Sequence, residues 1–320
     1  MKPIDHGGAL DVAIERWGGE RSGWLDLSTG INPVATPFPT PKMYAWTRLP
    51  DAGAERALEA AARTAYDVPE ELGIVAAPGT QAIIQHLPRM FEPLDVAVVG
   101  PTYAEHARSW EAAGHRVRMV ECPADADVLI VVNPNNPDGI DRPADELVDR
   151  AGVLTVVDEA FRDASPDRSV VPLRGARTLA LKSLGKFHGL AGVRLGHAIG
   201  PPSMTEALHD MLGPWAVSGP ALQIGEHVLR SDRTAIAAGL GRRRAMLDRV
   251  LRDHGLRVVG GTPFFALVEH EEADKLFAGL ARRFVLARRF DYRSDWLRFG
   301  LPATDAEFAR LAGALADVPS

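Results

Sequence analysis

The sequence lacks the features that mark secreted, membrane-bound and nucleic-acid-binding proteins. It contains one cysteine, Cys122, so no internal disulfide can form, and this cysteine usage is typical of the cytoplasm. No stretch approaches the roughly 18 apolar residues of a membrane span, and the first residues have no apolar signal-peptide core. The net charge is −6, which argues against nucleic acid as a main partner. We therefore expect a cytoplasmic protein that binds neither membranes nor nucleic acids.

Several catalytic motifs are also missing. There is no GxxxxGK[ST] phosphate loop, no strand-linked GxGxxG and no GxSxG nucleophile turn. There is no HExxH, and the ten histidines are scattered along the chain. These absences exclude the common nucleotide-binding and serine-hydrolase patterns, and the sequence predicts no metal site.

What the chain does contain is an ordinary globular composition, with 46% hydrophobic and 24% charged residues. Its length suits one large domain or two unequal ones. We expect an irregular, glycine- and proline-rich segment over residues 1–50 that contributes to a cleft and to the small domain. We expect a large α/β domain over 51–215 and a small α+β domain over 216–320.

Apolar strands alternate with helices through the first two thirds of the chain. The pattern predicts helices over 54–66, 103–113 and 144–151, and strands over 73–77, 96–99, 116–120, 128–132, 153–157, 178–181 and 196–199. Continuous apolar strands separated by helices indicate a mostly parallel sheet covered on both faces. Beyond residue 204 helices dominate, with a long one over 232–254, and short strands follow.

Polar residues follow many of these strands, and ligands of such sheets bind beyond the strands' carboxyl ends. Gly79, Thr80 and Gln81 open a helix, whose free N–H groups attract phosphate. Tyr103, Asn136 and Asp158 follow three other strands, and a segment with Ser183, Lys186 and Arg194 follows another. We expect all of these groups to meet at one edge of the sheet.

Lys186, taken alone, is more typical of a solvated surface loop, but its companions change that interpretation. Asp158, beside a cationic ring nitrogen, would stay ionised and keep that nitrogen protonated. Asn136 could donate to a phenolic oxygen, and Tyr103 could stack on a ring. Ser183 and Arg194 could hold a phosphate. A phosphorylated pyridine that forms an imine with lysine satisfies all of these groups, and pyridoxal phosphate is that molecule.

Three motifs resemble those of fold-type I, pyridoxal-phosphate-dependent enzymes of the class I/II aminotransferase superfamily. Residues 133–139 (NPNNPDG) resemble the family's NPNNPTG, residues 158–161 (DEAF) its DEAY or DEAF, and residues 183–196 its lysine segment. The resemblance implies that Lys186 is the imine-forming lysine, that Asp158 pairs with the ring nitrogen, and that Arg298 binds the substrate carboxylate. It also implies cofactor contacts from Asn136 and Tyr103, and phosphate contacts from Gly79, Thr80, Gln81, Ser183 and Arg194.

The N-terminal segment resembles a narrower group, the L-threonine-O-3-phosphate decarboxylases of cobalamin synthesis. Residues 5–8 (DHGG) and 27–33 (LSTGINP) are similar to segments of that group, as is PTYAEH at 101–106. His6, Gly7, Gly8 and Asn32 could form a pocket for the substrate phosphate. A flexible terminus is the alternative for residues 6–8. Arg288 is a second candidate for substrate anions, and it could equally be a surface arginine.

The resemblance implies decarboxylation of L-threonine O-3-phosphate to (R)-1-amino-2-propanol O-2-phosphate and CO₂ by a homodimer. Histidinol-phosphate aminotransferase, with 2-oxoglutarate as partner substrate, is the alternative enzyme, and a non-catalytic protein of this fold is the alternative class. Three positions depart from the superfamily pattern. Asp138 replaces a threonine, Phe161 a tyrosine that bonds the ring oxygen, and Leu49 a tyrosine that reaches a phosphate across the dimer interface.

Overall fold

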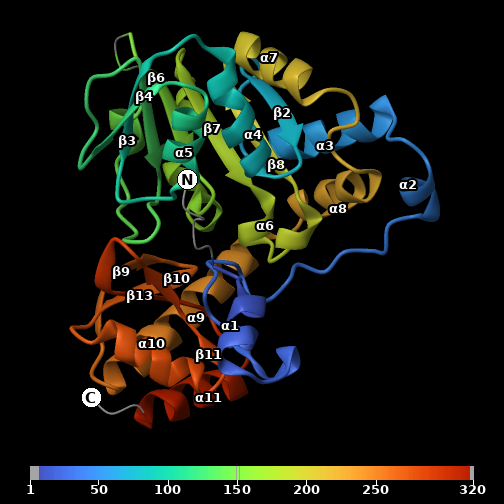
Figure 1. Ribbon diagram of the computed structural model, residues 1–320. Helices are drawn as coiled ribbons and strands as arrows, with labels where there is room; N and C mark the ends of the chain where they lie inside the picture. Colours follow the sequence, from blue (N-terminus) through green and yellow to red (C-terminus); the bar gives the residue numbers. More distant parts are fainter. Residues whose placement is uncertain (1–6, 149, 151, 318–320) are drawn as a thin grey trace. The chain divides into compact units, whose positions relative to one another are not determined.

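The computed structural model describes residues 7–148, 150 and 152–317 (Figure 1). The chain forms two compact units. Unit 1 comprises Met1–Val34, Pro137–Gly139 and Ala237–Ser320, and unit 2 comprises Ala35–Asn136 and Ile140–Ile236. The chain therefore passes from one unit to the other near residues 34 and 236. The domain boundaries expected from the sequence, at residues 50 and 215, stay a prediction. Within the described residues, no helix is long and apolar enough to cross a membrane.

Unit 2 is built on a seven-stranded sheet in the order β2-β8-β7-β6-β5-β3-β4. Its strands are β2 (Gly73–Ala77), β3 (Asp95–Val99), β4 (Arg116–Val120), β5 (Val128–Val132), β6 (Leu154–Asp158), β7 (Thr178–Ser183) and β8 (Gly196–Gly200). The pairs from β4 through β3, β5 and β6 to β7 are parallel, and β8 runs antiparallel to both neighbours. The expected mostly parallel sheet is confirmed.

Helices cover both faces of this sheet (Figure 1). On one face α3 (Ala52–Ala65) and α8 (Gly219–Leu229) pack on alternate strand residues. On the other face lie α4 (Thr80–His86), α5 (Glu105–Ala112) and α7 (Pro202–Leu212). Strands β5 and β6 are buried along their whole length, because a sheet covered on both sides leaves no solvated face. The short helices α2 (Met43–Thr47) and α6 (Leu184–Phe187) complete unit 2.

Unit 1 contains a four-stranded antiparallel sheet in the order β12-β13-β10-β9. These strands are β9 (Arg257–Thr262), β10 (Phe265–Glu269), β12 (Arg288–Phe290) and β13 (Arg293–Gly300). A two-stranded parallel pair joins β1 (Leu25–Asp26) to β11 (Val285–Leu286). The helices are α1 (Leu10–Trp17), α10 (Ala273–Ala281) and α11 (Asp305–Ala316), with α9 (Arg233–Asp253) running across the division at residue 236. The small α+β part is thus confirmed.

Two local predictions are wrong. The sequence predicts irregular structure before residue 50, but α1 is a regular helix, because Ala13, Leu10, Ile14 and Trp17 pack together in an apolar cluster with Trp24 and Leu286. The sequence predicts a helix over 144–151, but among the described residues of that range only Ala144–Glu146 is helical, as a 3₁₀ turn. A single turn is too short for helix propagation to offset the cost of nucleation.

A buried ionic cluster, formed by Glu159, Asp163, Lys182 and Arg233, lies on the α3 and α8 face of unit 2. The Lys182 ammonium is 2.6 Å from a Glu159 carboxylate oxygen and 3.6 Å from Asp163. Arg233 approaches the same Asp163 oxygen at 3.2 Å. Glu159 also accepts hydrogen bonds from the Ser169 hydroxyl and the Val170 amide. The cluster replaces water around Glu159, Asp163 and Lys182, which almost no solvent reaches, while the Arg233 side chain is 17% exposed.

Two buried histidines, His188 and His197, should make the free energy of unfolding depend on pH. Burial lowers the pKa of His188 and of His197 to about 4, from 6.5. The unfolded chain therefore binds more protons than the native chain between about pH 6.5 and 4, so acid favours unfolding there. We expect the free energy of unfolding to fall by about 3 kcal/mol per histidine across that window. Urea unfolding at pH 7 and pH 5 measures this change. His197→Phe should make the loss roughly half as steep, and an unchanged slope would contradict the assignment.

Candidate active site

The carboxyl ends of the parallel strands gather the predicted cofactor residues of unit 2 at one edge of the sheet. Asp158 ends β6, Ser183 ends β7, and Lys186 lies one turn later in α6. Tyr103 and Asn136 follow β3 and β5, whose neighbours in the sheet are parallel. Because β2 and β7 are both antiparallel to β8, Gly79 lies at the same edge. Topology therefore brings the whole set together.

Asp158 has its carboxylate fixed from two sides. One oxygen accepts a hydrogen bond from the Ala160 amide at 3.0 Å, and the other lies 2.9 Å from the His106 Nε2 atom. Both side chains are almost fully buried, at 4% and 1% exposed. His106 therefore orients the carboxylate. The sequence predicts no role for His106, and its position three residues after Tyr103, in the first turn of α5, is the signal that could have found it.

Tyr103 lies beside this pair and is fixed by its own hydrogen bonds. Its hydroxyl donates to the Gln81 Oε1 atom at 3.0 Å, and the Gln81 amide donates to Glu105 at 3.2 Å. The Tyr103 ring lies edge-on to the His106 ring, with centroids 6.1 Å apart. Burial raises the pKa of Tyr103 to about 12, so the phenol stays neutral and keeps its proton for this hydrogen bond.

Small residues make the predicted phosphate cradle. A side chain at Gly79 would bring a Cβ within 2.7 Å of the Arg194 guanidinium, and one at Gly196 within 2.6 Å of the Thr80 amide. Gly79 also has φ +83°, which other residues rarely adopt. Arg194 itself is left-handed, with φ +56°, and its NH1 donates to the Ala191 carbonyl at 3.2 Å. The backbone and the guanidinium can thus approach one anion closely.

Lys186 carries its ammonium 5.8 Å from the centre of the Phe161 ring. Phe161 occupies the position where the superfamily usually has a tyrosine. A phenylalanine offers the lysine a ring face but no hydroxyl, so Phe161 can steady the ammonium without a hydrogen bond. Phe161 is buried, at 4% exposed, and the end of the lysine side chain is therefore held against an apolar wall.

The predicted substrate residues lie in unit 1, and the structure describes all of them except His6, which falls outside the described residues. Gly7 touches the Ser28 carbonyl so closely that a Cβ would lie 2.4 Å from it. The Gly8 amide donates to the Ser28 hydroxyl at 2.7 Å. Asn32 is buried, and its side-chain oxygen accepts from the Val34 amide. Gly8 and Asn32 thus have structural bonds besides any role toward a phosphate.

Arg298 and Arg288 face one another across β12 and β13. Arg298 is 6% exposed and donates to the Ser28 carbonyl at 2.6 Å. Burial and, second, the charge of Arg288 lower the pKa of Arg298 to about 9. Tyr292 lies near both arginines, and burial raises its pKa to about 12. A bound anion would relieve the repulsion between the two guanidinium groups, so this pair is suited to a carboxylate or a phosphate.

The residues of unit 2 fit pyridoxal phosphate. They offer a lysine, a buried and oriented carboxylate, an aromatic ring and an anion cradle that a Cβ would fill. Each of these matches one part of the molecule, namely the aldehyde, the ring nitrogen, the ring face and the phosphate. Within the described residues, no group of three or more potential ligands is arranged to hold a metal ion.

Comparison with known proteins identifies the family to which the chain belongs. A threonine-phosphate decarboxylase from a Sinorhizobium species is 45% identical over 333 residues, covering 98% of each chain. A histidinol-phosphate aminotransferase from Mycobacterium bovis is 30% identical over 309 residues, covering 89% of this chain and 80% of that one. The solved structure of histidinol-phosphate aminotransferase from Sinorhizobium meliloti, in complex with pyridoxal-5'-phosphate, superposes with a TM-score of 0.81 at 18% identity, covering 99% and 95% of the two chains. The model of the family "Aminotransferase class I and II" matches residues 45–315, and the chain belongs to that family.

Proposed function

We propose that the protein is a pyridoxal-phosphate-dependent decarboxylase that converts L-threonine O-3-phosphate to (R)-1-amino-2-propanol O-2-phosphate and CO₂ in cobalamin biosynthesis. The 45% identity to a threonine-phosphate decarboxylase, over 98% of both chains, is the observation that supports decarboxylation. The similarity to a histidinol-phosphate aminotransferase is lower, at 30%. The geometry of the cofactor residues supports an enzyme rather than a non-catalytic relative.

The residues of unit 2 would share the work at the cofactor. When bound, pyridoxal phosphate takes up the electrons of the bond that breaks at the substrate Cα. Lys186 would hold the cofactor covalently and, once displaced, return a proton to Cα. Asp158, oriented by His106, would keep the ring nitrogen protonated. Tyr103 would cover one face of the ring, and Asn136 would donate to its phenolic oxygen. Gly79, Thr80, Gln81, Ser183 and Arg194 would bind the phosphate.

The residues of unit 1 would bind the two anionic ends of the substrate. Arg298 would bind the carboxylate, and Arg288, its partner across the two strands, would add a second positive charge. His6, Gly7, Gly8 and Asn32 would bind the substrate phosphate. Decarboxylation requires the bond from Cα to the carboxylate to stand perpendicular to the cofactor ring. Two anchored ends restrict rotation about Cα, whereas one anchor leaves it free, so the anion sites select the bond that breaks.

The protein would act as a cytoplasmic homodimer without nucleic-acid or membrane partners. The single cysteine, Cys122, is exposed, which suits a reducing compartment. Several large apolar side chains of unit 2 are exposed near one another in the sequence, as expected of a surface that a second copy covers. They are Met43, Tyr44, Trp46 and Leu49, at 74%, 49%, 62% and 66% exposed. Leu49 would meet the second copy through apolar contact only.

The alternative is an aminotransferase of the histidinol-phosphate type, favoured by the 30% identical relative. One assay separates the two reactions. The purified protein, loaded with pyridoxal phosphate, is given L-threonine O-3-phosphate without any 2-oxo acid, and released CO₂ and the amine product are measured. Sustained turnover supports the decarboxylase. Turnover that needs 2-oxoglutarate and yields glutamate would instead establish the aminotransferase.

His106→Phe tests whether the hydrogen bond to Asp158 matters for the reaction. The variant leaves a buried carboxylate oxygen without its partner, and a hydrogen bond to a charged group contributes about 1.5–3 kcal/mol. We expect kcat to fall by about ten- to a hundredfold with KM little changed, because the ring nitrogen and not the substrate is affected. Steady-state kinetics measure both. His106→Gln, whose side chain can still donate a hydrogen bond, should recover part of the lost kcat. Equal kcat in both variants would show that the hydrogen bond to Asp158 does not matter for the reaction.

Arg298→Ala should weaken substrate binding more than cofactor binding. Loss of the guanidinium removes a charge-assisted contact to the carboxylate, and we expect kcat/KM to fall by about a hundredfold or more. The visible absorbance of the bound cofactor should stay intact, since Arg298 is not among the residues proposed to hold the cofactor. Loss of that absorbance would mean that Arg298 serves folding instead. Arg257→Ala, on the same sheet in an exposed ion pair with Glu269, is the matched control.

A further inference from the structure

Ser28 in unit 1 contacts both groups of residues that are proposed to bind the two anions of the substrate. Its hydroxyl accepts a hydrogen bond from the Gly8 amide at 2.7 Å. Its carbonyl accepts one from the Arg298 guanidinium at 2.6 Å. Ser28 is 2% exposed and has no role in the proposed reaction. One buried residue therefore joins the proposed phosphate-binding segment to the proposed carboxylate-binding arginine.

Asp26 fixes both the backbone and the hydroxyl of Ser28 at the end of β1. One oxygen of the Asp26 carboxylate accepts from the Ser28 amide at 2.9 Å and from the Ser28 hydroxyl at 2.6 Å. The first of these bonds closes an Asx turn, in which a side chain mimics a backbone turn. Because the hydroxyl proton is donated to Asp26, the hydroxyl oxygen faces the Gly8 amide as an acceptor. The carboxylate thus sets the direction of the bonds that Ser28 makes.

Glycines let the backbone segments around Ser28 approach one another closely. A Cβ at Gly7 would lie 2.4 Å from the Ser28 carbonyl oxygen and 3.6 Å from a nitrogen of Arg298. A Cβ at Gly300, two residues after Arg298 in β13, would lie 2.3 Å from the Thr29 carbonyl oxygen. The carboxylate and the phosphorus of the proposed substrate are separated by only two carbon atoms and one oxygen, so the groups that bind them must lie this close together.

We propose that Ser28 is a positioning residue that sets the spacing between the two anion-binding groups, and that Asp26 holds Ser28 in place. The inference rests on the proposed function, because it takes the segment of Gly7 and Gly8 and the guanidinium of Arg298 as binding groups for one substrate. In this role Ser28 acts through its two donors and need not touch either anion. Two donors at a fixed separation bind two linked anions more tightly than they bind either anion alone.

Three probes without an amine measure this spacing independently of the reaction. 4-Phosphonobutanoate carries a carboxylate and a phosphonate at the separation found in L-threonine O-3-phosphate, whereas butanoate and propylphosphonate each carry one of the two anions. Full-length protein loaded with pyridoxal phosphate is titrated with the dianion by calorimetry, and displacement of the dianion measures the two monoanions. We expect the parent to bind the dianion about tenfold or more tightly than either monoanion.

Ser28→Ala should weaken 4-phosphonobutanoate about tenfold and each monoanion less than about twofold, because loss of the hydroxyl lets the Gly8 amide move independently of Arg298. Thr262→Val is the matched control in unit 1. The buried Thr262 hydroxyl also accepts from a backbone amide, that of Phe264 at 3.1 Å. The control should lose a similar amount of stability in urea and keep the affinity of the parent, which separates positioning from folding.

Two variants of Asp26 keep the proposal falsifiable if Ser28→Ala does not fold. Asp26→Asn keeps an acceptor oxygen for Ser28 and removes a negative charge that repels anions, so it should bind the dianion at least as tightly as the parent. Asp26→Ala removes the same charge and the acceptor as well, and it should bind the dianion about tenfold more weakly than Asp26→Asn. Equal affinity in the two variants would contradict the role of Asp26.

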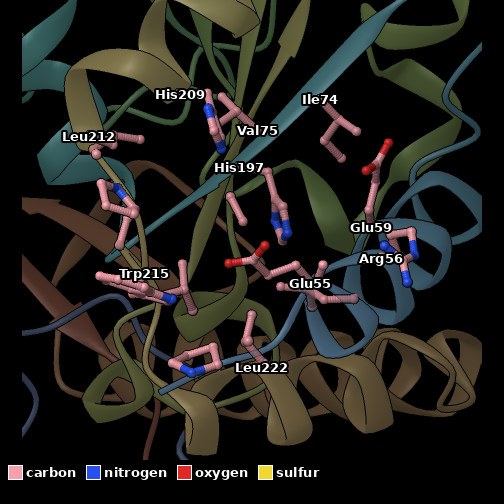
Figure 2. Close-up of a pocket in the computed structure, with 18 residues that line it drawn as sticks. Glu55, Arg56, Glu59, Ile74, Val75, His197, His209, Leu212, Trp215 and Leu222 are labelled. Carbon is pink, nitrogen blue, oxygen red and sulfur yellow. The ribbon is translucent and has the colours of Figure 1, made fainter.

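A hollow of about 480 Å³ in unit 2 supplies the control for where the dianion binds (Figure 2). Arg56 lines this hollow together with Glu55, Glu59 and His209, and an arginine offers an anion a contact that does not involve unit 1. Arg56 is exposed, so Arg56→Gln should leave the fold intact. We expect this variant to bind 4-phosphonobutanoate as tightly as the parent.

Three results would each overturn the proposal. They are equal affinity of the parent for the dianion and a monoanion, no greater loss of dianion affinity in Ser28→Ala than in Thr262→Val, and loss of dianion binding in Arg56→Gln. A protein that binds the dianion as expected but releases no CO₂ from L-threonine O-3-phosphate would refute the proposed reaction, and the role of Ser28 would stand.

Discussion

Lys186→Ala is expected to lower kcat/KM for L-threonine O-3-phosphate by on the order of 10⁴-fold or more, because the variant loses both the covalent anchor of the cofactor and the proton donor to Cα. The visible absorbance of the lysine-bound cofactor should vanish at the same time. Assays of CO₂ release and an absorbance spectrum of the purified variant measure the two effects. The fold should survive, since Lys186 lies in the short helix α6 and outside the buried ionic cluster.

Lys42→Ala is the matched control for this variant. Lys42 also lies in unit 2, but its side chain is exposed just before α2. Its removal should leave both the spectrum and the turnover unchanged. If Lys186→Ala retained more than a few per cent of the parent turnover, another group would be the anchor, and the proposed chemistry of this lysine would be wrong.

Lys182→Met should cause the largest loss of stability. The change leaves Glu159 and Asp163 buried without their shared cation, and removal of one partner from a buried pair costs about 3–5 kcal/mol. That is a large part of the roughly 5–15 kcal/mol that stabilises a folded protein. Urea unfolding at pH 7 measures the difference. Methionine has a similar volume, so the loss of charge and not a cavity is tested.

A double variant separates the ionic effect from packing. In Lys182→Met with Glu159→Gln, the buried carboxylate is gone as well, so the second change should cost less than it does alone. Arg230→Ala removes an exposed partner of Glu226 in α8 and should cost less than about 1 kcal/mol. Purely additive effects of Lys182→Met and Glu159→Gln would show that the two charges do not stabilise one another.

The strands of unit 2 could be predicted because five consecutive apolar residues, as in β5, have few other ways to become buried. The strand ends then located Asp158, Ser183 and Lys186, since parallel strands present their carboxyl ends at one edge. Helix α1 could not be predicted in the same way. Glycines and prolines surround it in sequence, and its apolar face is buried by Phe277, Phe284 and Leu286, which lie more than 250 residues later.

The hydrogen-bond and ion-pair partners of the site residues could not be predicted from the sequence either. A histidine three residues after Tyr103 has many possible neighbours, and only the fold places it 2.9 Å from Asp158, which is 52 residues away. Likewise, the sequence of β7 gives no reason for a lysine at position 182. The reason is the ion pair with Glu159, which only the folded structure shows. Motifs identify residue types, whereas distances between separate strands depend on how those strands are ordered in the sheet.

The two adjacent carboxylates at the end of β6 have a consequence for folding. Asp158 contacts α5 on one face of the sheet, and Glu159 joins Lys182 on the other. Apart from Thr155, which pairs with Thr178, the residues between the ends of β6 and β7 are apolar and do little to distinguish the native alignment from one shifted by a single residue. A shift would exchange the faces of Asp158 and Glu159 and leave charges buried without partners. The ion pair thus selects the alignment of the two strands, and chains with Lys182→Met should misalign more often during refolding.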